Sequence, residues 1–369
     1  MYKPAQIGAK LITEGNNMEN LVVQKFMDIN INDPFFDSLK ADYVEFTAWF
    51  ERKADNNALV LYSEQGLIEG FLYCKFESGP GNDTAPLLPN ANHMKVGTFK
   101  FNPKKTRRGD RYLKKIFDYA LAAQPLVDDI YVTVFAEKHN YLAELFQRYG
   151  FEHYGNKVTG NGTESVLVRR LDKFHGNVDK DYPFINTRGN RKHLLSIYPA
   201  FHSKLFPDSI LFNESPNIVQ DISHSNSIHK IYICKMADVM NFQRGDLIVI
   251  YRTGDGQGAA EYRAVATSIC VVESVRNIEE FRTENEFLSY CLKFSIFTEK
   301  ELIEIYREKK YPYIINFTYN AALPKRPIRK QLADDAGISR DQYWGALELT
   351  DEQFESVITL GELDRKIIM

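Results

Sequence analysis

Cysteines, long apolar runs and an excess of either charge are all scarce in this sequence. Its four cysteines, at positions 74, 234, 270 and 291, lie far apart without CxxC spacing, which argues against a disulfide framework and a cysteine-based zinc site. No apolar stretch approaches the roughly 18 residues that a membrane-spanning helix requires. The first residues lack the apolar core of a secretory signal. We therefore expect a cytoplasmic protein with no membrane contact and no metal.

The charge balance gives no overall reason to expect a nucleic-acid partner. Lysine and arginine total 46 against 49 acidic residues, for a net charge of −3, so any nucleic-acid site has to be a local patch. The chain is 44% hydrophobic and 26% charged, which excludes a disordered or fibrous protein. At about 150 residues per domain, a length of 369 residues predicts two or three domains.

The pattern of residues 1–171 predicts an α/β domain. Its expected elements are a helix that starts at Asp37 or Ser38 and continues through Phe50, a hairpin of 58–62 and 68–76, a loop over 79–93, a strand over 95–101, a helix marked by Leu113 and Ile116, a strand over 130–135, a helix stopped by Gly150, and a strand around 166–168. Residues 172–192 lose apolar periodicity and are rich in Lys, Asp, Asn, Gly and Pro. We expect a linker there and a second domain over 193–369.

A basic turn joins the strand Lys95–Phe101 to the helix that follows it. The turn runs from Lys104 to Arg108 and ends at Gly109. The N–H groups and the dipole of a helix N-terminus favour a bound pyrophosphate, and lysines and arginines add charge pairing. The alternative is a solvated basic loop without a ligand, which is what such a turn indicates when no other motif accompanies it.

A second motif follows the strand that ends near residue 136. Asn140, Ala143, Leu145, Gly150 and Phe151 fall in order on the Asn, Ala, Leu, Gly and Phe positions of the last helix in GNAT N-acetyltransferases. The chain resembles this family over about residues 20–171, and the order of its expected elements agrees. The resemblance implies an α/β fold, a mixed sheet flanked by helices, and transfer of an acetyl group from acetyl-CoA to an amine.

The resemblance also implies where acetyl-CoA lies. The pyrophosphate loop of the family reads Gln/Arg-x-x-Gly-x-Gly/Ala. With Gly109 as the second glycine, Lys104 takes the Gln/Arg position, Arg107 replaces the first glycine, and Tyr112 with the next apolar residues turns inward. The cofactor is then expected between the strands 95–101 and 131–135. Its expected contacts are Gly97, Thr98, Phe99, Phe101, Lys104, Arg107, Arg108, Gly109 and Asn140.

Acetylation of an amine needs a base for the ammonium and an acid for the leaving thiolate. The family often supplies the acid as a tyrosine four residues before the glycine, but this sequence has Phe146 there. Tyr141 or Tyr149 could replace it, although both could equally be structural tyrosines. The candidates for the base are Glu77, which we prefer, Glu69 and His93. The departures at Phe146 and Arg107 leave open a domain that binds an acyl-CoA without catalysis.

The second half of the sequence predicts short strands decorated by helices. Strands are expected over 230–234, 246–252, 262–272 and 313–317, and helices over 279–290 and 299–309. Ser196-Ile197 before Pro199 and the run Gly245-Asp246-Leu247 resemble the PUA-like superfamily, which includes ASCH and EVE-type domains. The resemblance covers about residues 190–320 and implies an α+β fold with a small β-barrel and a cleft for RNA or a modified base. The Gly-x-Lys-x-x-Glu-x-Arg signature of ASCH proteins is absent.

A cluster of basic residues lies near the end of the chain. It consists of Lys325, Arg326, Arg329 and Lys330, with Tyr319, Tyr343 and Trp344 nearby. Such a cluster could contact a nucleic-acid backbone while the aromatic rings stack on bases, or it could be a solvated loop. Residues 329–339 also resemble the first helix and turn of a helix-turn-helix. The would-be recognition helix, 340–347, has one basic residue and does not favour groove reading.

These observations predict an N-acetyltransferase that uses acetyl-CoA and acts on an amine acceptor. A PUA-like domain would recognise RNA, tRNA or another nucleic-acid-linked substrate. The alternative is a nucleic-acid-binding regulator, of a toxin–antitoxin type for example, whose GNAT-like domain is catalytically silent. The sequence leaves the acceptor open.

Overall fold

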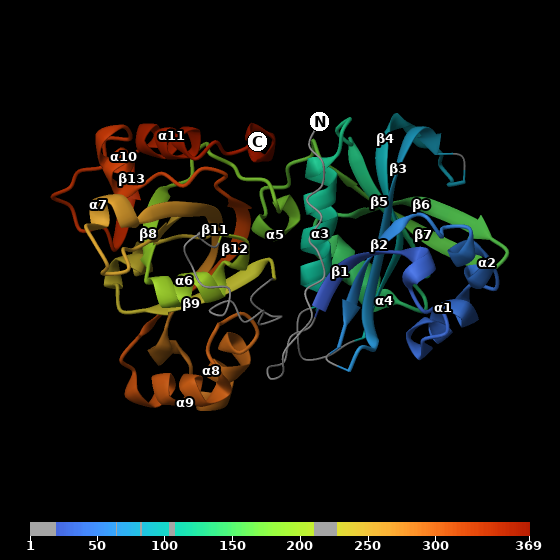
Figure 1. Ribbon diagram of the computed structural model, residues 1–369, viewed down its shortest axis with the longest axis horizontal. Helices are drawn as coiled ribbons and strands as arrows, with labels where there is room; N and C mark the ends of the chain where they lie inside the picture. The colour runs from blue at the N-terminus through green and yellow to red at the C-terminus, as the bar shows by residue number, and fades with distance from the viewer. Residues whose placement is uncertain (1–19, 64, 82, 103–107, 210–226) are drawn as a thin grey trace.

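The computed structural model describes residues 20–63, 65–81, 83–102, 108–209 and 227–369. Two β-sheets, each accompanied by helices, lie side by side (Figure 1). The sheet at the right of Figure 1 is formed within residues 20–170 and the sheet at the left within residues 192–349. We call the two parts the first unit and the second unit. In the described part of the chain, every helix is too short or too polar to cross a lipid bilayer.

The sheet of the first unit has seven strands in the order β1-β2-β3-β4-β5-β7-β6. All neighbouring pairs are antiparallel except β4 and β5, which run parallel. A parallel pair needs a crossover connection, and the α3 helix provides it. The strands are β1 (Asn20–Lys25), β2 (Asn57–Tyr62), β3 (Ile68–Gly81), β4 (Leu88–Phe101), β5 (Asp129–Val134), β6 (Glu152–Thr159) and β7 (Gly162–Arg170).

Helices cover both faces of this sheet. Leu59 and Leu61 of β2 belong to one core, and Val60 between them belongs to the other, as the alternation of side chains along a strand requires. The helices α3 (Arg108–Ala122) and α4 (Asn140–Arg148) pack on the first face, and α1 (Asp37–Asp42) and α2 (Phe46–Glu51) pack on the second. Leu113 and Ile116 are fully buried, so α3 has the orientation that the sequence predicts.

Several expected boundaries in the first unit were wrong. The predicted loop over 79–93 is largely strand, because β3 and β4 continue to pair from Glu77 opposite His93 to Gly81 opposite Leu88. Its Gly, Pro and Asn residues suggested a loop, but pairing with the neighbouring strand overrides that preference. The strands β1 and β6 were not expected. The predicted helix from Asp37 or Ser38 is divided into α1 and α2, and Asp33 instead caps a short 3₁₀ turn, Pro34–Phe36.

The sheet of the second unit has six strands in the order β13-β8-β10-β11-β12-β9. The expected small barrel is not closed: among the described residues, β13 and β9 each pair with a single neighbour. The strands are β8 (Lys192–Ile197), β9 (His229–Cys234), β10 (Leu247–Arg252), β11 (Val265–Asn277), β12 (Tyr313–Ala322) and β13 (Ala346–Leu349). The helices are α6 (Pro199–Leu205), α7 (Ala260–Arg263), α8 (Glu284–Cys291), α9 (Glu299–Glu308), α10 (Arg329–Asp334) and α11 (Asp351–Leu360).

The helix-turn-helix hypothesis for residues 329–347 is wrong. The first helix exists as α10, but no helix follows it over 340–347. Trp344 is instead buried in the core, and Ala346–Leu349 pairs with β8 as an edge strand. Burial of the indole and the gain of backbone hydrogen bonds both favour this extended conformation.

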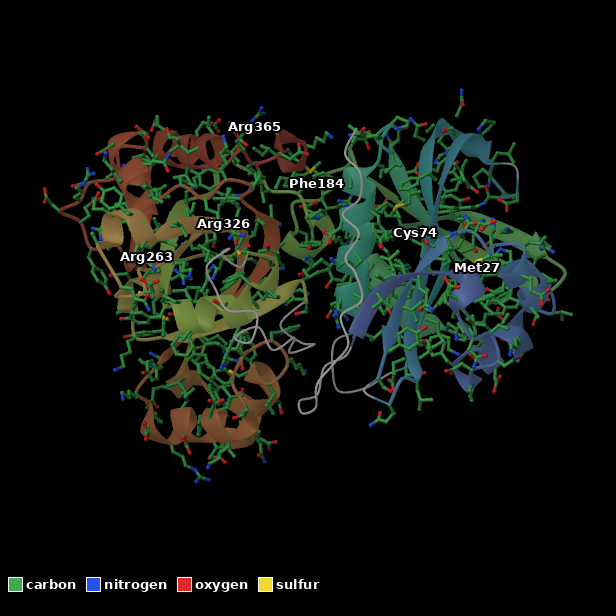
Figure 2. All side chains as sticks on the ribbon, viewed as in Figure 1. Met27, Cys74, Phe184, Arg263, Arg326 and Arg365 are labelled. Carbon is green, nitrogen blue, oxygen red and sulfur yellow. The ribbon has the colours of Figure 1, made fainter. Side chains whose placement is uncertain are left out.

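The segment between the two sheets is folded against both of them. Tyr182 joins the core of the first unit, where its ring lies 5.5 Å from the ring of Phe117. Ile185 joins a core of the second unit. Phe184, which Figure 2 shows between the units, lies 5.9 Å from the guanidinium carbon of Arg169 on β7. The division into domains over 1–171 and 193–369 with a linker over 172–192 remains our proposal.

A buried chain of hydrogen bonds crosses the contact between the units. The Tyr149 hydroxyl at the end of α4 donates to Asp110 Oδ1 at 2.9 Å and lies 2.8 Å from His229 Nε2 on β9. His229 Nδ1 lies 2.9 Å from Glu273 Oε2 on β11. Because Tyr149 donates its one proton to Asp110, His229 Nε2 has to donate to the hydroxyl, while Nδ1 donates to the carboxylate. This arrangement of donors favours the charged form of His229.

Asp179, on α5 (Val178–Asp181), completes this cluster. Arg244 Nη2 lies 3.3 Å from Asp179 Oδ2, and one atom each of Asp179, His229 and Glu273 lie within 4.8 Å of one another. Hydrogen bonds occupy both nitrogens of His229, so the structure shows this cluster as a hydrogen-bond network. Burial alone lowers the pKa of His229, but the hydrogen bond to Glu273 and the charges of Asp110 and Asp179 raise it above its ordinary value.

Candidate functional site

A cleft opens in the first unit where its two parallel strands separate. Pairing between β4 and β5 ends at Val96 opposite Val132, although β4 continues to Phe101 and β5 to Val134. Beyond Val96, β4 keeps its pairing with β3 on one edge only. Among the described strands, none pairs with the other edge of Gly97–Phe101. This edge therefore offers backbone N–H and C=O groups to a ligand.

Gly97 forms a bulge at the point where the strands separate. Tyr73 pairs with Thr98 and Cys74 pairs with Val96, so Gly97 is the extra residue in β4. A Cβ atom at Gly97 would lie 2.9 Å from Cδ1 of Tyr73, which is closer than side chains tolerate. The Tyr73 ring is held by Phe26 and Trp49 at centroid distances of 5.1 and 5.8 Å. The local packing therefore requires glycine.

The cleft encloses a cavity of about 320 Å³. It extends from the separated strands to the loops and helices near residues 38–53 and 139–142. Its polar and aromatic lining consists of Ser38, Asp42, Tyr43, Glu45, Phe46, Trp49, Lys53, Tyr73, Lys75, Lys95, Thr98, Phe99, Lys100, Thr133, Phe135, His139, Tyr141, Lys157, Thr159 and Glu164.

Tyr43 and Glu164 form the most buried polar pair of the cleft. The Tyr43 hydroxyl donates to Glu164 Oε1 at 2.7 Å, and Glu164 is 4% exposed. Burial and the neighbouring carboxylate raise the pKa of Tyr43 far above its ordinary value, so its hydroxyl stays protonated. Burial also lowers the pKa of Lys95. The cleft thus holds a carboxylate that can accept a proton and an amine that is less firmly charged than usual.

A second polar group lies at the α4 end of the cleft. His139 Nε2 lies 2.9 Å from Asp42 Oδ2, and Lys138 Nζ lies 3.0 Å from Asp42 Oδ1. Burial alone raises the pKa of Asp42, but these two hydrogen bonds bring it below its ordinary value. Tyr141, one of the expected acids, is exposed and lines the cleft beside His139.

The structure places only part of the expected cofactor contacts in the cleft. Gly97, Thr98 and Phe99 line it. Phe101 packs against Gly109, where a Cβ atom would lie 3.1 Å from the Phe101 ring, so glycine allows α3 to approach β4. The expected contacts Lys104, Arg107 and the side chain of Arg108 lie outside the described residues. Asn140 is exposed and donates to Glu144 Oε1 at 2.6 Å, away from the lining of the cleft.

The structure does not bring Glu77 or Tyr149 into the cleft. Glu77 accepts a hydrogen bond from Tyr131 and pairs with Lys75. Although burial raises the pKa of Glu77, these partners lower it below its ordinary value, which weakens the carboxylate as a base. Tyr149 is buried in the network between the units, as described above. Sequence analysis missed Glu164, whose strand was expected only over 166–168.

The two other candidate bases and Phe146 also lie outside the lining of the cleft. His93 is buried, and its Nδ1 lies 2.7 Å from Asp129 Oδ1. Glu69 is buried near the start of β3. Phe146 is fully buried with its ring 5.2 Å from that of Phe99, so a core contact replaces the tyrosine of the family pattern.

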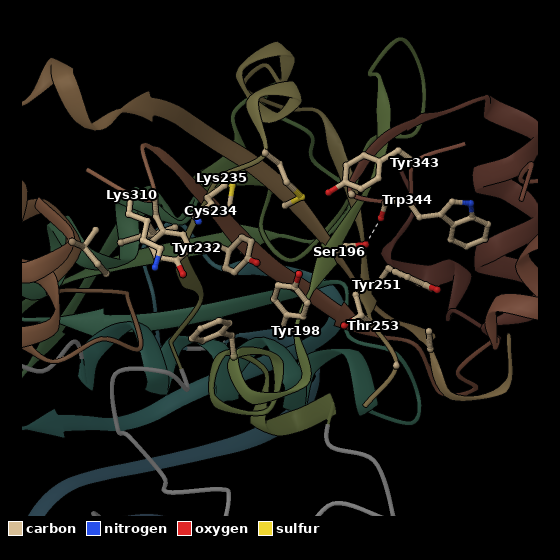
Figure 3. A pocket seen from close by; sticks show the side chains of 18 of the residues that line it. Ser196, Tyr198, Tyr232, Cys234, Lys235, Tyr251, Thr253, Lys310, Tyr343 and Trp344 are labelled. Atoms are coloured by element: carbon tan, nitrogen blue, oxygen red, sulfur yellow. Dashed lines mark hydrogen bonds between the residues drawn. The ribbon is translucent and has the colours of Figure 1, made fainter. Parts of the chain in front are cut away.

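The second unit contains a larger cavity of about 860 Å³, which Figure 3 shows from close by. The hydroxyls of Tyr198, Tyr232 and Tyr343 point toward the same space (Figure 3). Five charged side chains at its mouth are exposed, and Arg329 is half-buried. The polar and aromatic lining consists of Ser196, Tyr198, Phe201, Tyr232, Lys235, Tyr251, Thr253, Phe297, Glu301, Glu304, Glu308, Lys310, Tyr311, Arg329, Gln342, Tyr343 and Trp344.

Trp344 and Arg329 form one end of this cavity. The indole N–H of Trp344 donates to the carbonyl of Ser339 at 2.9 Å, and Ser196 donates to the Trp344 carbonyl. The Arg329 guanidinium lies 4.7 Å from the indole centroid, in a cation–π contact. The Tyr251 ring lies 5.3 Å away on the same indole. These contacts fix the indole and hold Arg329 against it.

The basic cluster of the sequence is divided by the fold. Lys325 pairs with Glu362 at 2.5 Å, Arg326 is half-buried, and Lys330 is exposed. Arg329 alone among the four lines the cavity. The expected aromatic neighbours divide similarly: Tyr343 and Trp344 line the cavity, whereas Tyr319 is buried with its hydroxyl 3.0 Å from that of Ser209.

The chain is similar to solved structures of both kinds that its sequence resembles. ASCH from Zymomonas mobilis is 12% identical, and the match covers 46% of this chain and 94% of that one with a TM-score of 0.28. A GNAT family N-acetyltransferase from Escherichia coli, solved in complex with CoA, is 11% identical, and the match covers 43% of this chain and 85% of that one with a TM-score of 0.26. No protein-family profile and no curated protein matches the chain. At these identities and TM-scores the matches do not indicate an activity. We therefore infer the activity from the side chains of the chain itself.

Proposed function

We propose that the first unit is an N-acetyltransferase that transfers the acetyl group of acetyl-CoA to an amine. The observation that supports this most is the cleft between β4 and β5, with its free strand edge, its bulge at Gly97 and the α3 N-terminus directly after β4. A thioester ligand with a long amide arm and a pyrophosphate would use the free edge for its amides and the helix start for its phosphates. The same molecule would recognise RNA or a nucleic-acid-linked substrate through the cavity of the second unit.

The residues of the cleft fit acetyl-CoA. The free edge of Gly97–Phe101 would hydrogen-bond to the amides of the pantetheine arm. The first N–H groups of α3, with the lysine and arginines of the basic turn before it, would hold the pyrophosphate. Bound acetyl-CoA would supply the activated acetyl group.

Two side chains of the cleft can carry the protons of the reaction. Glu164 would accept a proton from the acceptor ammonium, directly or through the hydroxyl of Tyr43. Tyr141, whose phenol lies at the open side of the cleft, would donate a proton to the leaving thiolate of CoA. We assign the base to Glu164 in place of Glu77, because Glu77 is held by Lys75 and Tyr131 outside the lining.

Calorimetric titration of the full chain with acetyl-CoA tests this proposal. We expect binding, and we expect it to weaken at least about tenfold when Lys104 and Arg107 are both changed to alanine, because two charge-assisted contacts to phosphate are lost. The double variant Lys25→Ala and Arg52→Ala removes the same charge from the first unit away from the turn and should bind normally. Absence of acetyl-CoA binding by the unmodified protein would rule the enzyme out.

A second function is favoured by the departures at Phe146 and Arg107. In this alternative the first unit is catalytically silent and the protein is a nucleic-acid-binding regulator. It predicts that the protein retains tRNA or single-stranded RNA with an affinity that falls steeply with salt, without transferring acetyl groups. The contents of the cleft argue for the enzyme, since Tyr43 and Glu164 place a buried carboxylate next to a protonated phenol there.

A further inference from the structure

Three lysines gather in the cleft of the first unit, near the point where β4 and β5 separate. Lys75 on β3 stands directly opposite Lys95 on β4. The ammonium groups of Lys157 and Lys95 lie 2.5 and 3.7 Å from the same oxygen, Asp83 Oδ2. All three lysines line the cleft. Like charges directly opposite each other on neighbouring strands destabilise a sheet, and a bound anion would offset that repulsion.

The alternation of side chains places these lysines on the face of the sheet that α1 and α2 cover. Val96 belongs to the core on the α3 and α4 face, so its neighbour Lys95 leaves the opposite face. Lys75 is two residues from Tyr73, which belongs to the core on the α1 and α2 face. Tyr43, the partner of Glu164, packs against the same core. The lysines therefore share one side of the cleft with the proposed base.

The carboxylates that pair with the lysines do not line the cleft. Lys75 pairs with Glu77, and Asp83 serves both Lys95 and Lys157. Neither carboxylate is among the described residues that line the cavity, where five lysines stand against three carboxylates. Burial, and next the charge of Lys157, lower the pKa of Lys95, and an anion in the cleft would counter both effects. The cleft thus presents an excess of positive charge to a ligand.

This positive charge lies too far along β4 to serve the phosphates of CoA. Lys95 precedes Phe101, the last residue of β4, by six residues, which is roughly 20 Å of extended strand. The basic turn and the α3 N-terminus, which would hold the pyrophosphate, come only after Phe101. The remaining phosphate of CoA is on its ribose, still farther from the thioester. The anion that suits the lysines therefore belongs to the other substrate.

The lysines also lie close to the proposed base. Lys157 on β6 stands opposite Glu164 on β7, and residues in such positions have Cβ atoms about 4.5–5.5 Å apart. The Lys157 ammonium pairs with Asp83, while Glu164 accepts from the hydroxyl of Tyr43. A proton acceptor and a positive group thus stand side by side. A molecule that reaches both needs an ammonium and an anion that only a few bonds separate.

We infer that the acceptor is a small amine that also carries an anionic group, and that Lys75, Lys95 and Lys157 bind this group. The inference rests on the proposed acetyltransferase activity and names its class of substrate. The acceptor nitrogen forms a bond to the acetyl carbon, and the carbon–sulfur bond breaks with its electron pair going to sulfur. The ammonium loses two protons in all. One goes to Glu164, and the other replaces the proton that Tyr141 gives to the sulfur.

Calorimetric titration of the full chain with two matched pairs of amines tests the inference. CoA is present in place of acetyl-CoA, so that no acetyl group is transferred. The pairs are β-alanine with β-alaninamide, and O-phosphoethanolamine with ethanolamine, and the members of each pair differ in the anionic group. We expect the anionic member of at least one pair to bind at least about tenfold more tightly. The pair that shows this preference distinguishes a carboxylate from a phosphate.

Two variants remove single charges from the cleft. Lys95→Met and Lys157→Met should each weaken binding of the preferred anionic amine about tenfold and leave its neutral partner unaffected. In an acetylation assay they should raise KM with little change in kcat, because the anion is bound equally in the ground and transition states. A lysine with a purely structural role would affect both amines alike.

Lys25→Met is the matched control. Lys25 is an exposed lysine on β1 of the same sheet, and its ammonium also lies 3.7 Å from an aspartate, Asp55. This variant should bind and acetylate the amines as the unmodified protein does. Normal acetyl-CoA binding by Lys95→Met and Lys157→Met would show that both variants are folded.

The failures of the two proposals are distinguishable. If acetyl-CoA binds and neither pair shows a preference, or none of the four amines binds, the inference is wrong and the acetyltransferase proposal stands. A preference that survives both Lys95→Met and Lys157→Met also overturns the inference. If the protein binds an anionic amine through Lys95 but does not bind acetyl-CoA, the anion site stands and the acetyltransferase proposal fails.

Discussion

Gly97 is the residue on which the shape of the cleft depends. It is the extra residue in β4 where that strand leaves β5, and the Tyr73 ring lies where its Cβ would stand. The ring is packed between other aromatic residues and has little room to move. The bulge, the separation of the strands and the position of Tyr73 in the lining therefore depend on one missing side chain.

Changing Gly97 to alanine should reduce the free energy of unfolding by about 1–3 kcal/mol, because the added methyl overpacks a filled core. It should also weaken acetyl-CoA binding, since the bulge sets the free edge of β4. Chemical denaturation and calorimetry measure the two effects. Gly160→Ala is the matched control, because no heavy atom lies within 4 Å of a Cβ there. Equal stability of the two variants would contradict the role of Gly97.

Among the elements, α9 begins with a reciprocal capping box in its first turn. The Thr298 hydroxyl accepts from the N–H of Glu301 at 3.3 Å, and Glu301 accepts from the N–H of Thr298 at 2.7 Å. This reciprocal capping box satisfies two N–H groups that a helix start leaves without partners. The helix carries three carboxylates that line the large cavity, Glu301, Glu304 and Glu308, so the cap also positions these charges.

Thr298→Ala should lower the free energy of unfolding by about 1 kcal/mol, the usual cost of losing an N-cap. Thr298→Ser keeps the hydroxyl and should restore most of the stability. The exposed Lys300, in the same turn, provides the control Lys300→Ala, which should have a much smaller effect. Urea denaturation of the three variants measures the difference. If Thr298→Ser lost as much free energy of unfolding as Thr298→Ala, the hydroxyl would not be the group that stabilises the helix start.

At the scale of the whole molecule, the two units are joined through His229. It connects Tyr149 and Asp110 of the first unit with Glu273 of the second, and Asp179 and Arg244 stand beside this chain. Asp110 lies in the first turn of α3, directly after the expected pyrophosphate turn. The network thus ties the proposed cofactor end of the first unit to the second unit.

The raised pKa of His229 predicts that stability depends on pH in this region. A group whose pKa is higher in the folded state contributes stability fully below its unfolded pKa of about 6.5 and loses it as pH rises through the folded value. The free energy of unfolding should therefore decrease from about pH 6.5 upward. His229→Gln should be less stable at the acidic end and lose this part of the dependence. The exposed His153 gives the control His153→Gln, and an unchanged pH profile in His229→Gln would exclude the charged histidine.

Local sequence patterns were sufficient to predict the elements α3, β5 and α4. Leu113 and Ile116 recur at helical spacing, and Gly150 adopts a positive φ of 80° at the end of α4, so both the buried face and the stop are encoded by neighbouring residues. The basic turn and the last-helix motif pointed to an acetyltransferase resemblance for the same reason. Strand limits in the Gly-rich and Asn-rich segment were not predictable, because pairing with distant strands determined them.

The sites themselves were decided by the tertiary structure. Tyr43 and Glu164 are separated by 120 residues in the chain and meet only because β7 and the loop after α1 reach the same cleft. The large cavity likewise takes Tyr251, Arg329 and Trp344 from separate segments. The fold also places Glu77 and Tyr149 outside the lining of the cleft, where they have other hydrogen-bond partners. The sequence by itself determined which residues are apolar, basic or able to end a helix. Only folding determined which polar atoms are buried next to one another, because such contacts join residues with no local relation in the chain.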